Sequence, residues 1–315
     1  MYNEERKIRF LTETRSSKGA EDFGKSVFHT TEPYEQEAGK DFCELTIDVL
    51  QSIANTEFGV RTRTMETTIA LLRSYVSWCK EHGYLTCDDI YELKTEMGDK
   101  VRRMMIASPT HLEVVLNKIF EPVQSETVDC LYRCYFWMGF AGLEDSEAVE
   151  VTVDEIDFST MTIEHGGKSY EIYREAVPAF KMACEATQFR YVHPGYSSDE
   201  KQQGIYRDRY PGKHLLRGIR SSQIKLTTIK AHTGKKLKAN GIETTYGKIR
   251  LSGLYYKTYE MERFGEPVNF DAIIVERISK TPQNYHRNYT RSKFAGVIKR
   301  SLLEDYECWK SVFTK

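Results

Sequence analysis

Residues 141–173 read AGLEDSEAVEVTVDEIDFSTMTIEHGGKSYEIY, and this stretch decides the fold class. It overlaps the end of an aromatic-rich apolar run, TVDCLYRCYFWMGFAGL (127–143), which predicts a long buried helix ending near Gly142. Apolar and polar residues then alternate, a pattern typical of short strands, and the glycines of HGGK (165–168) predict a tight turn between two of them. The three expected strands lie around Val151–Ile156, Met161–Ile163 and Tyr170–Ile172.

Helical periodicity dominates the rest of the chain. Apolar residues at three- and four-residue steps predict helices within 41–54, 65–84 and 88–105, with Thr64 as a cap of the second. Ser108, followed by a proline, opens a further helix. Residues 1–40 are polar and suggest an arm or a loosely packed lead-in, and residues 193–213 suggest a long loop before more helices. The expected fold is therefore mainly α with a small antiparallel β-sheet.

Two domains fit a chain of 315 residues. We expect a helical domain with a polar N-terminal arm at 1–106, and a larger mixed domain at 107–315. Hydrophobic content of 40% and charged content of 29% are typical of a soluble globular protein. No run of 18 apolar residues predicts a membrane span, and the charged N-terminus does not resemble a secretion signal.

Seven cysteines form no Cys-x-x-Cys pair, which favours free thiols in a reducing cytoplasm. His232 and His286 lack the spacing of paired metal ligands, so we predict no metal and no cofactor.

Charge is distributed unevenly along the chain. Residues 201–250 hold 13 Lys and Arg against two acids, Asp208 and Glu243, a local charge of +11. The remainder must carry −12, because the whole chain carries −1. A basic block in an otherwise acidic protein predicts a polyanionic partner such as nucleic acid, although a solvated basic face is the plainer alternative.

The order of these elements resembles the tyrosine recombinases, or phage integrases, over roughly residues 40–315. LRSYVSWCKEHGY (72–84) is similar to the closing helix of their core-binding domain, and 141–163 is similar to their glycine-leucine-arginine-x-x-glutamate box with its following sheet. The resemblance implies two domains that clamp duplex DNA from opposite sides. The box residues that match are Gly142, Leu143 and Glu147, while Glu144 stands where the family has its first catalytic arginine.

The other family positions are partly kept. Lys168 lies in a turn where the family has a lysine. GKIRLSGLYY (247–256) is similar to the His-x-x-Arg box, with Arg250 matching the arginine and Gly247 replacing the histidine. The nucleophilic tyrosine would fall near Tyr285 or Tyr289, although core packing or phosphate hydrogen bonding also suits these residues.

These replacements bear on the chemistry. Cleavage by a tyrosine needs cations around the phosphate and groups that carry protons. Glu144 places a negative charge beside the phosphate, and Gly247 removes a proton carrier, so we expect no catalytic residues and no strand exchange. A clamp that binds without cutting resembles the recombinase-like lytic-cycle repressors of SPβ-type temperate phages. That resemblance implies a transcriptional repressor that maintains the prophage at operator-like sites in its own genome, in the bacterial cytoplasm.

Basic side chains in both domains are the candidate DNA contacts. They are Lys168, Arg217, Arg220, Lys225, Lys230 and Arg250, with Arg61, Arg63 and Arg73 from the first domain.

Several alternatives remain open. Glu144 is either a surface residue after a helix or the partner of Arg250 in an internal ion pair, and Lys168 is either a solvated turn residue or a phosphate contact. A divergent active recombinase would draw on His165, His286 and Tyr289. A protein that regulates a recombinase would use the C-terminal helix, whose face of Tyr306, Trp309 and Phe313 also suits self-association or docking on its own domain.

Overall fold

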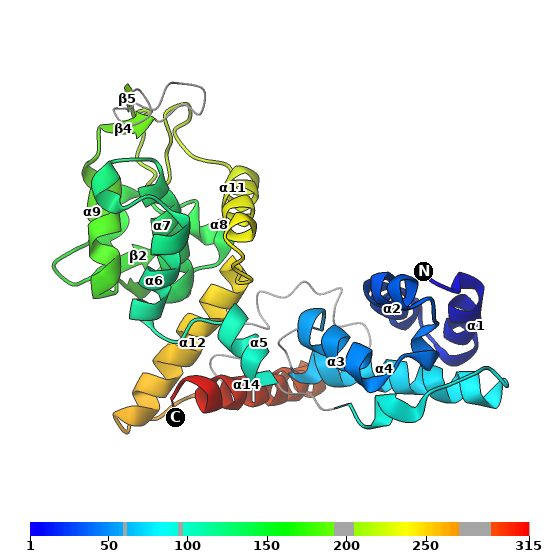
Figure 1. Ribbon diagram of the computed structural model, residues 1–315. Coiled ribbons are helices and arrows are strands. Elements are labelled where there is room, and N and C mark those ends of the chain that lie inside the picture. Colours follow the sequence, from blue (N-terminus) through cyan, green and yellow to red (C-terminus); the bar gives the residue numbers. More distant parts are fainter. Residues whose placement is uncertain (59–61, 94–96, 192–204, 271–290, 315) are drawn as a thin grey trace. The chain divides into compact units, whose positions relative to one another are not determined.

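The computed structural model describes residues 1–58, 62–93, 97–191, 205–270 and 291–314. The chain divides into two compact units, Met1–Val101 with Asn269–Lys315, and Arg102–Val268. Helices dominate both, and the strands form two small antiparallel sheets (Figure 1), so the predicted fold class is confirmed. The first unit includes residues 269–315, which the sequence analysis assigned to the second domain. The predicted domain limits themselves stay a prediction.

The described residues of the first unit form helices and no strand. They are α1 (Glu4–Thr14), α2 (Lys18–Ala38), η1 (Phe42–Glu44), α3 (Ile47–Thr56), α4 (Thr62–Glu81), η2 (Asp88–Tyr91), most of α5 (Met97–Met104) and α14 (Arg291–Phe313). Helix α4 begins at Thr62, so the predicted cap at Thr64 is wrong. All seven cysteines of the chain are free thiols, as predicted. Among the described residues, no helix has both the length and the apolar composition of a membrane span.

The expected polar arm at residues 1–40 is wrong. Helices α1 and α2 pack into the core of the first unit, where Phe10, Leu11 and Phe28 are fully buried. Phe10 makes edge-to-face contacts with Phe28 and Tyr75, at centroid distances of 6.1 and 5.2 Å. The sequence pattern hides this packing because charged residues surround the few apolar ones.

Two of the charged residues in this segment form a buried ion pair, which is one reason why the segment looks polar in the sequence. Lys7 donates to both carboxylate oxygens of Glu35 at 2.5 and 2.6 Å, and neither side chain is exposed. The same carboxylate accepts from the Thr31 hydroxyl at 2.9 Å and from the backbone N–H of Phe42 at 2.7 Å. Burial raises the pKa of Glu35. Because the charges are paired and the carboxylate is fully hydrogen-bonded, they can lie inside a core.

The second unit combines helices with both sheets. Its helices are α6 (Pro109–Ile119), η3 (Val123–Ser125), α7 (Asp129–Ala141), α8 (Asp145–Ala148), η4 (Val153–Glu155), η5 (Arg174–Ala176), α9 (Val177–Glu185), α11 (Leu226–Ala239) and α12 (Tyr246–Arg263). The strands are β1 (Ile156–Asp157), β2 (Thr162–His165), β3 (Lys168–Glu171), β4 (Gln188–Tyr191) and β5 (Ile205–Asp208). As predicted, Ser108 caps α6 by accepting from the N–H of His111 at 3.1 Å.

The first sheet has the order β1-β2-β3. The predicted turn is confirmed, since Gly166 and Gly167 both have positive φ, 59° and 73°, and His165 pairs with Lys168 across it. The first strand is shorter than predicted because η4 occupies 153–155. The second sheet, β4-β5, was not predicted. Every β5 residue is exposed, so no alternation marks that strand.

Helix α7 is the centre of the second unit. All residues from Asp129 to Phe140 are buried. Helix α12 crosses α7 so closely that a Cβ atom on Gly253 would lie 1.8 Å from the Phe140 carbonyl oxygen. Only glycine permits this backbone approach, and it sets the position of α12 against the end of α7.

We predict that Gly253→Ala destabilises the protein by about 3 kcal/mol or more, because the methyl group must push two helices apart. The free energy of unfolding, measured by urea denaturation of the full chain, checks this. The matched control is Gly234→Ala on α11, where a Cβ meets nothing within 4 Å. This control should stabilise the helix by about 0.5–1 kcal/mol. Equal effects of the two variants would contradict the close approach.

Candidate nucleic-acid interface

Glu144 is placed by the end of α7. Gly142 adopts a left-handed conformation with φ 116° and ends the helix. Leu143 then enters the core, fully buried, and Glu144 takes the N-cap position of α8. The carboxylate of Glu147 accepts from the backbone N–H of Glu144 at 2.8 Å. The three residues that match the family box thus form the turn that presents residue 144.

Arg250 approaches from α12. Thr245 caps this helix by accepting from the N–H of Lys248 at 3.3 Å, and Arg250 follows in the second turn. Its guanidinium donates to the carboxylate of Glu144 in an ion pair whose side chains are 25% and 32% exposed. The structure therefore brings together two positions that the sequence analysis aligned with arginines of the recombinases, and joins them as a salt bridge.

Gly247 and Lys168 border the same region. A Cβ on Gly247, in the first turn of α12, would meet nothing within 4 Å, so a side chain at this position has open space. Lys168 is exposed at the start of β3, and Tyr170 of that strand lies 3.8 Å from where a Cβ of Gly142 would be. Tyr285, Tyr289 and His286 lie outside the described residues.

His165, a candidate proton carrier in the active alternative, has a structural partner. Its Nδ1 lies 3.0 Å from a carboxylate oxygen of Glu155. That carboxylate also accepts from the N–H of Thr152 at 2.7 Å. His232 stacks on Tyr132 at a centroid distance of 4.4 Å, and burial lowers the pKa of His232. His165 is thus explained by a local carboxylate partner, and His232 by stacking on an aromatic ring.

Part of the basic block at 201–250 is neutralised within the unit. Lys230 pairs with Asp145 at 2.5 Å, and Lys236 pairs with Asp129 at 2.5 Å. The guanidinium of Arg217 donates to the His214 carbonyl at 2.7 Å, and burial lowers its pKa. The predicted contact Arg217 is therefore engaged in the fold of the second unit.

Five basic residues of the block are exposed on helix α11 or in the loop just before it, and together we call them the α11 surface. Helix α11 contains no Asp or Glu, and it buries Ile229, Thr233 and Leu237 on one stripe. Its exposed lysines form no ion pair with any carboxylate in the described part of the chain, apart from Lys230. The exposed members of the α11 surface are Arg220, Lys225, Lys230, Lys235 and Lys238. Arg220 lies in the loop before the helix, and Lys225 is the N-cap residue.

The DNA contacts predicted from the first domain are Arg61, Arg63 and Arg73. The guanidinium of Arg73 donates to the carbonyls of Ile90 and Tyr91 at 3.3 and 3.4 Å, so it serves the fold of its own unit. Arg63 lies on α4, and Arg61 lies outside the described residues.

Sequence reasoning missed Arg209, which anchors the loop that leads to the α11 surface. It is 6% exposed, and burial lowers its pKa to about 10. Its guanidinium donates to the carbonyls of Ala183, Ala186 at 3.3 Å, Leu215 at 2.5 Å and Arg217 at 3.4 Å. It pairs with no carboxylate among the residues described. Nothing in the sequence marks it, because its acceptors are backbone groups.

The N-terminal part of the chain matches a known family of protein domains. Residues 1–81 match the family described as "MrpR, N-terminal core-binding domain". The match includes residues 1–40, in agreement with the packed helices α1 and α2. A comparison with curated proteins gives no match.

Three solved structures are similar to the chain at low identity. An integrase from mycobacterium phage Brujita is 13% identical, covering 98% of this chain and 91% of its own, with a TM-score of 0.35. XerA recombinase is 11% identical, covering 84% and 85%, with a TM-score of 0.33. The Tn1549 transposon integrase, in complex with circular intermediate DNA, is 13% identical, covering 92% and 98%, with a TM-score of 0.35.

We predict that Arg209→Met lowers the free energy of unfolding by about 3 kcal/mol, because several buried carbonyls lose their donor. Amide hydrogen exchange in residues 210–218 should accelerate with it. The control is Arg207→Met on β5, two residues earlier, where the side chain is exposed and the unfolding midpoint should not move. A stable Arg209→Met protein with unchanged exchange would contradict the anchoring role.

Proposed function

We propose that this protein binds double-stranded DNA at specific sites without cutting it, and acts as a transcriptional repressor that maintains a prophage. The observation that carries the proposal is the ion pair of Glu144 with Arg250. This pair supports the loss of DNA strand cleavage. It also supports the retention of a scaffold that can bind phosphate.

Loss of cleavage follows from the charges at this pair. A tyrosine attacking phosphate needs preorganised cations where negative charge develops. Here one guanidinium nitrogen of Arg250 is bonded to a carboxylate, and that carboxylate belongs to residue 144, which we align with the first arginine position. Losing one such donor costs about 2.7–4 kcal/mol in comparable oxyanion sites, and a repelling charge adds to this. Gly247 offers no proton carrier.

Retention of DNA binding rests on the α11 surface. Phosphate contacts by Lys and Arg supply most of the affinity for a duplex, through release of counterions. An acid-free helix with exposed lysines suits this role. The match of residues 1–81 to a core-binding domain supports a second contact region. The repressor role rests on the resemblance to the lytic-cycle repressors of SPβ-type phages.

The alternative function, regulation of a recombinase, would need an exposed face on the C-terminal helix α14. Tyr306 and Trp309 are each only 1% exposed, and α14 packs against α4 within the first unit. Their rings stack at a centroid distance of 6.4 Å. The face that would dock on a partner is used for internal packing.

A gel-shift experiment tests the proposal. The protein is mixed with fragments of its own genome, and each reaction is run natively and after SDS. We expect a few fragments to shift natively and to return to the free position after SDS. A shifted band that survives SDS would reveal a phosphotyrosine link, and the reading of Glu144 would be wrong. A uniform shift of all fragments would remove the claim of specificity.

We predict that Glu144→Gln tightens binding to the shifted fragment about 3- to 10-fold at low salt, because Arg250 becomes available to phosphate and a repelling charge is gone. The slope of log K against log salt should steepen by about one, as expected for one more phosphate contact. Filter binding across a salt series measures both.

The control is Glu5→Gln on α1, which changes the net charge equally with an exposed side chain far along the sequence. It should leave the slope unchanged. If Glu144→Gln weakens binding, or behaves as Glu5→Gln does, Arg250 does not face DNA.

A further inference from the structure

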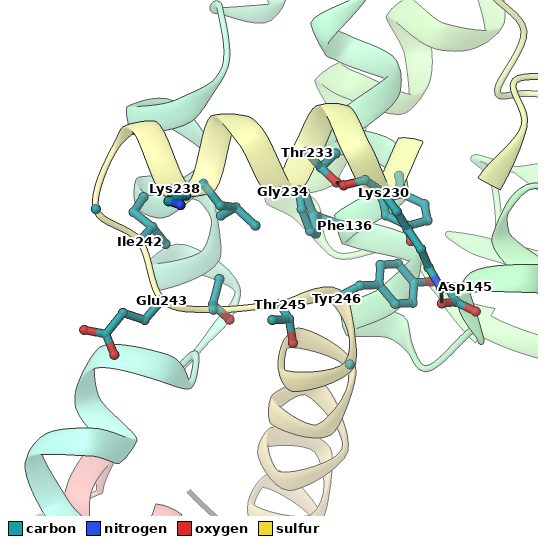
Figure 2. A pocket seen from close by; sticks show the side chains of 15 residues that line it. Phe136, Asp145, Lys230, Thr233, Gly234, Lys238, Ile242, Glu243, Thr245 and Tyr246 are labelled. Atoms are coloured by element: carbon teal, nitrogen blue, oxygen red, sulfur yellow. Dashed lines mark hydrogen bonds and ion pairs between the residues drawn. The ribbon is translucent and has the colours of Figure 1, made fainter. Parts of the chain in front are cut away.

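The second unit contains a cavity of about 730 Å³ between α11 and the first turn of α12. Its wall is largely aromatic and aliphatic, with contributions from Phe136, Leu237, Ile242 and Tyr246. Figure 2 shows Phe136 and Thr233 on one side and Thr245 and Tyr246 at the start of α12 on the other. Both the volume and the lining are typical of sites for small organic ligands.

Two lining residues carry buried hydroxyls that lack a partner. Tyr135 is 1% exposed and Thr244 is 4% exposed. Within the described part of the chain, neither hydroxyl makes a hydrogen bond. Tyr135 stacks on Tyr246 at a centroid distance of 4.2 Å, which fixes its ring. Buried polar groups without partners are rare in native proteins, so these two hydroxyls leave unmet hydrogen-bonding capacity in the wall of the cavity.

The charges around the cavity favour an anion. Both acidic lining residues are already paired, Asp145 with Lys230 at 2.5 Å and Glu243 with Arg103 at 3.2 Å. Figure 2 shows Lys230 extending to Asp145, and Lys238 at the other end of α11. Lys238 makes no ion pair with a described carboxylate. The 18-residue helix α12 begins at the cavity, so the positive end of its dipole lies there.

Two glycines keep the volume open. Gly234 and Gly247 both line the cavity, and a Cβ on either would meet nothing within 4 Å. Gly247 stands where the recombinase family has a histidine. The space that a histidine side chain would fill is therefore free beside the cavity. The glycine that removes a proton carrier therefore also contributes room for a ligand.

We propose that this cavity binds a small amphipathic anion, with a planar apolar body and one carboxylate, and that its occupancy lowers the affinity for DNA. The apolar body lies against the aromatic wall, while the carboxylate faces Lys238 and the start of α12. The effect on DNA rests on the proposed function. It follows because Lys230 belongs to both the cavity and the α11 surface, and because α12 carries Arg250 one turn from the cavity.

Binding is tested first on the full chain without DNA. The probes are 2-naphthoate and its neutral analogue 2-naphthamide, titrated with detection by saturation-transfer NMR. We expect 2-naphthoate to bind at least 10-fold more tightly than the amide. Equal binding of the two would overturn the assignment of an anion, and no binding of either would overturn the site.

Matched leucine variants locate the site. Gly247→Leu and Gly234→Leu fill the cavity and should each weaken 2-naphthoate binding at least 10-fold. The control is Gly19→Leu, at the second residue of α2, as Gly247 is in α12, with equally open space around its Cβ. It should bind 2-naphthoate as the parent does. Binding that survives both cavity variants would overturn the location.

Coupling is tested last, on the shifted fragment of the gel experiment. Saturating 2-naphthoate should weaken DNA binding at least 3-fold, and DNA should weaken naphthoate binding by the same factor, because linkage is reciprocal. Unchanged DNA affinity in a protein that binds naphthoate would overturn the regulatory part. If no fragment shifts at all, the proposed function fails while the result without DNA still decides the cavity.

Discussion

The backbone contact between Gly253 and the Phe140 carbonyl is the constraint on which the second unit depends. It lets α12 lie directly on α7, and every feature near residue 144 follows from that crossing. Helix α7 ends within two residues of Phe140 and delivers Glu144. Helix α12 delivers Arg250 one turn before Gly253. The ion pair forms because both helices are held at that separation.

The matching residues of the family box have structural reasons to be present that are independent of catalysis. Gly142 supplies a left-handed turn, Leu143 enters the core, and Glu147 binds the backbone of residue 144. Such residues can be kept for structural reasons alone, so their presence does not by itself establish an activity.

Local signals made much of the second unit predictable. Gly142, the diglycine at 166–167 and Ser108 each act within a few residues, so the sequence shows their effect directly. Interactions between distant positions were not predictable. The buried pair of Lys7 with Glu35 spans 28 positions and makes α1 and α2 look like a solvated arm. The ion pair of Glu144 with Arg250 spans 106 positions. From the sequence, this pair is only one of two alternatives for Glu144.

Arg209 has a consequence for how the molecule meets a charged partner. Its guanidinium is held by carbonyl oxygens, so within the described residues no carboxylate cancels its charge. With a pKa of about 10 it is protonated at neutral pH. Arg209 is therefore a fixed source of positive potential beneath the 210–225 loop, because the carbonyl groups of the fold hold its guanidinium in place.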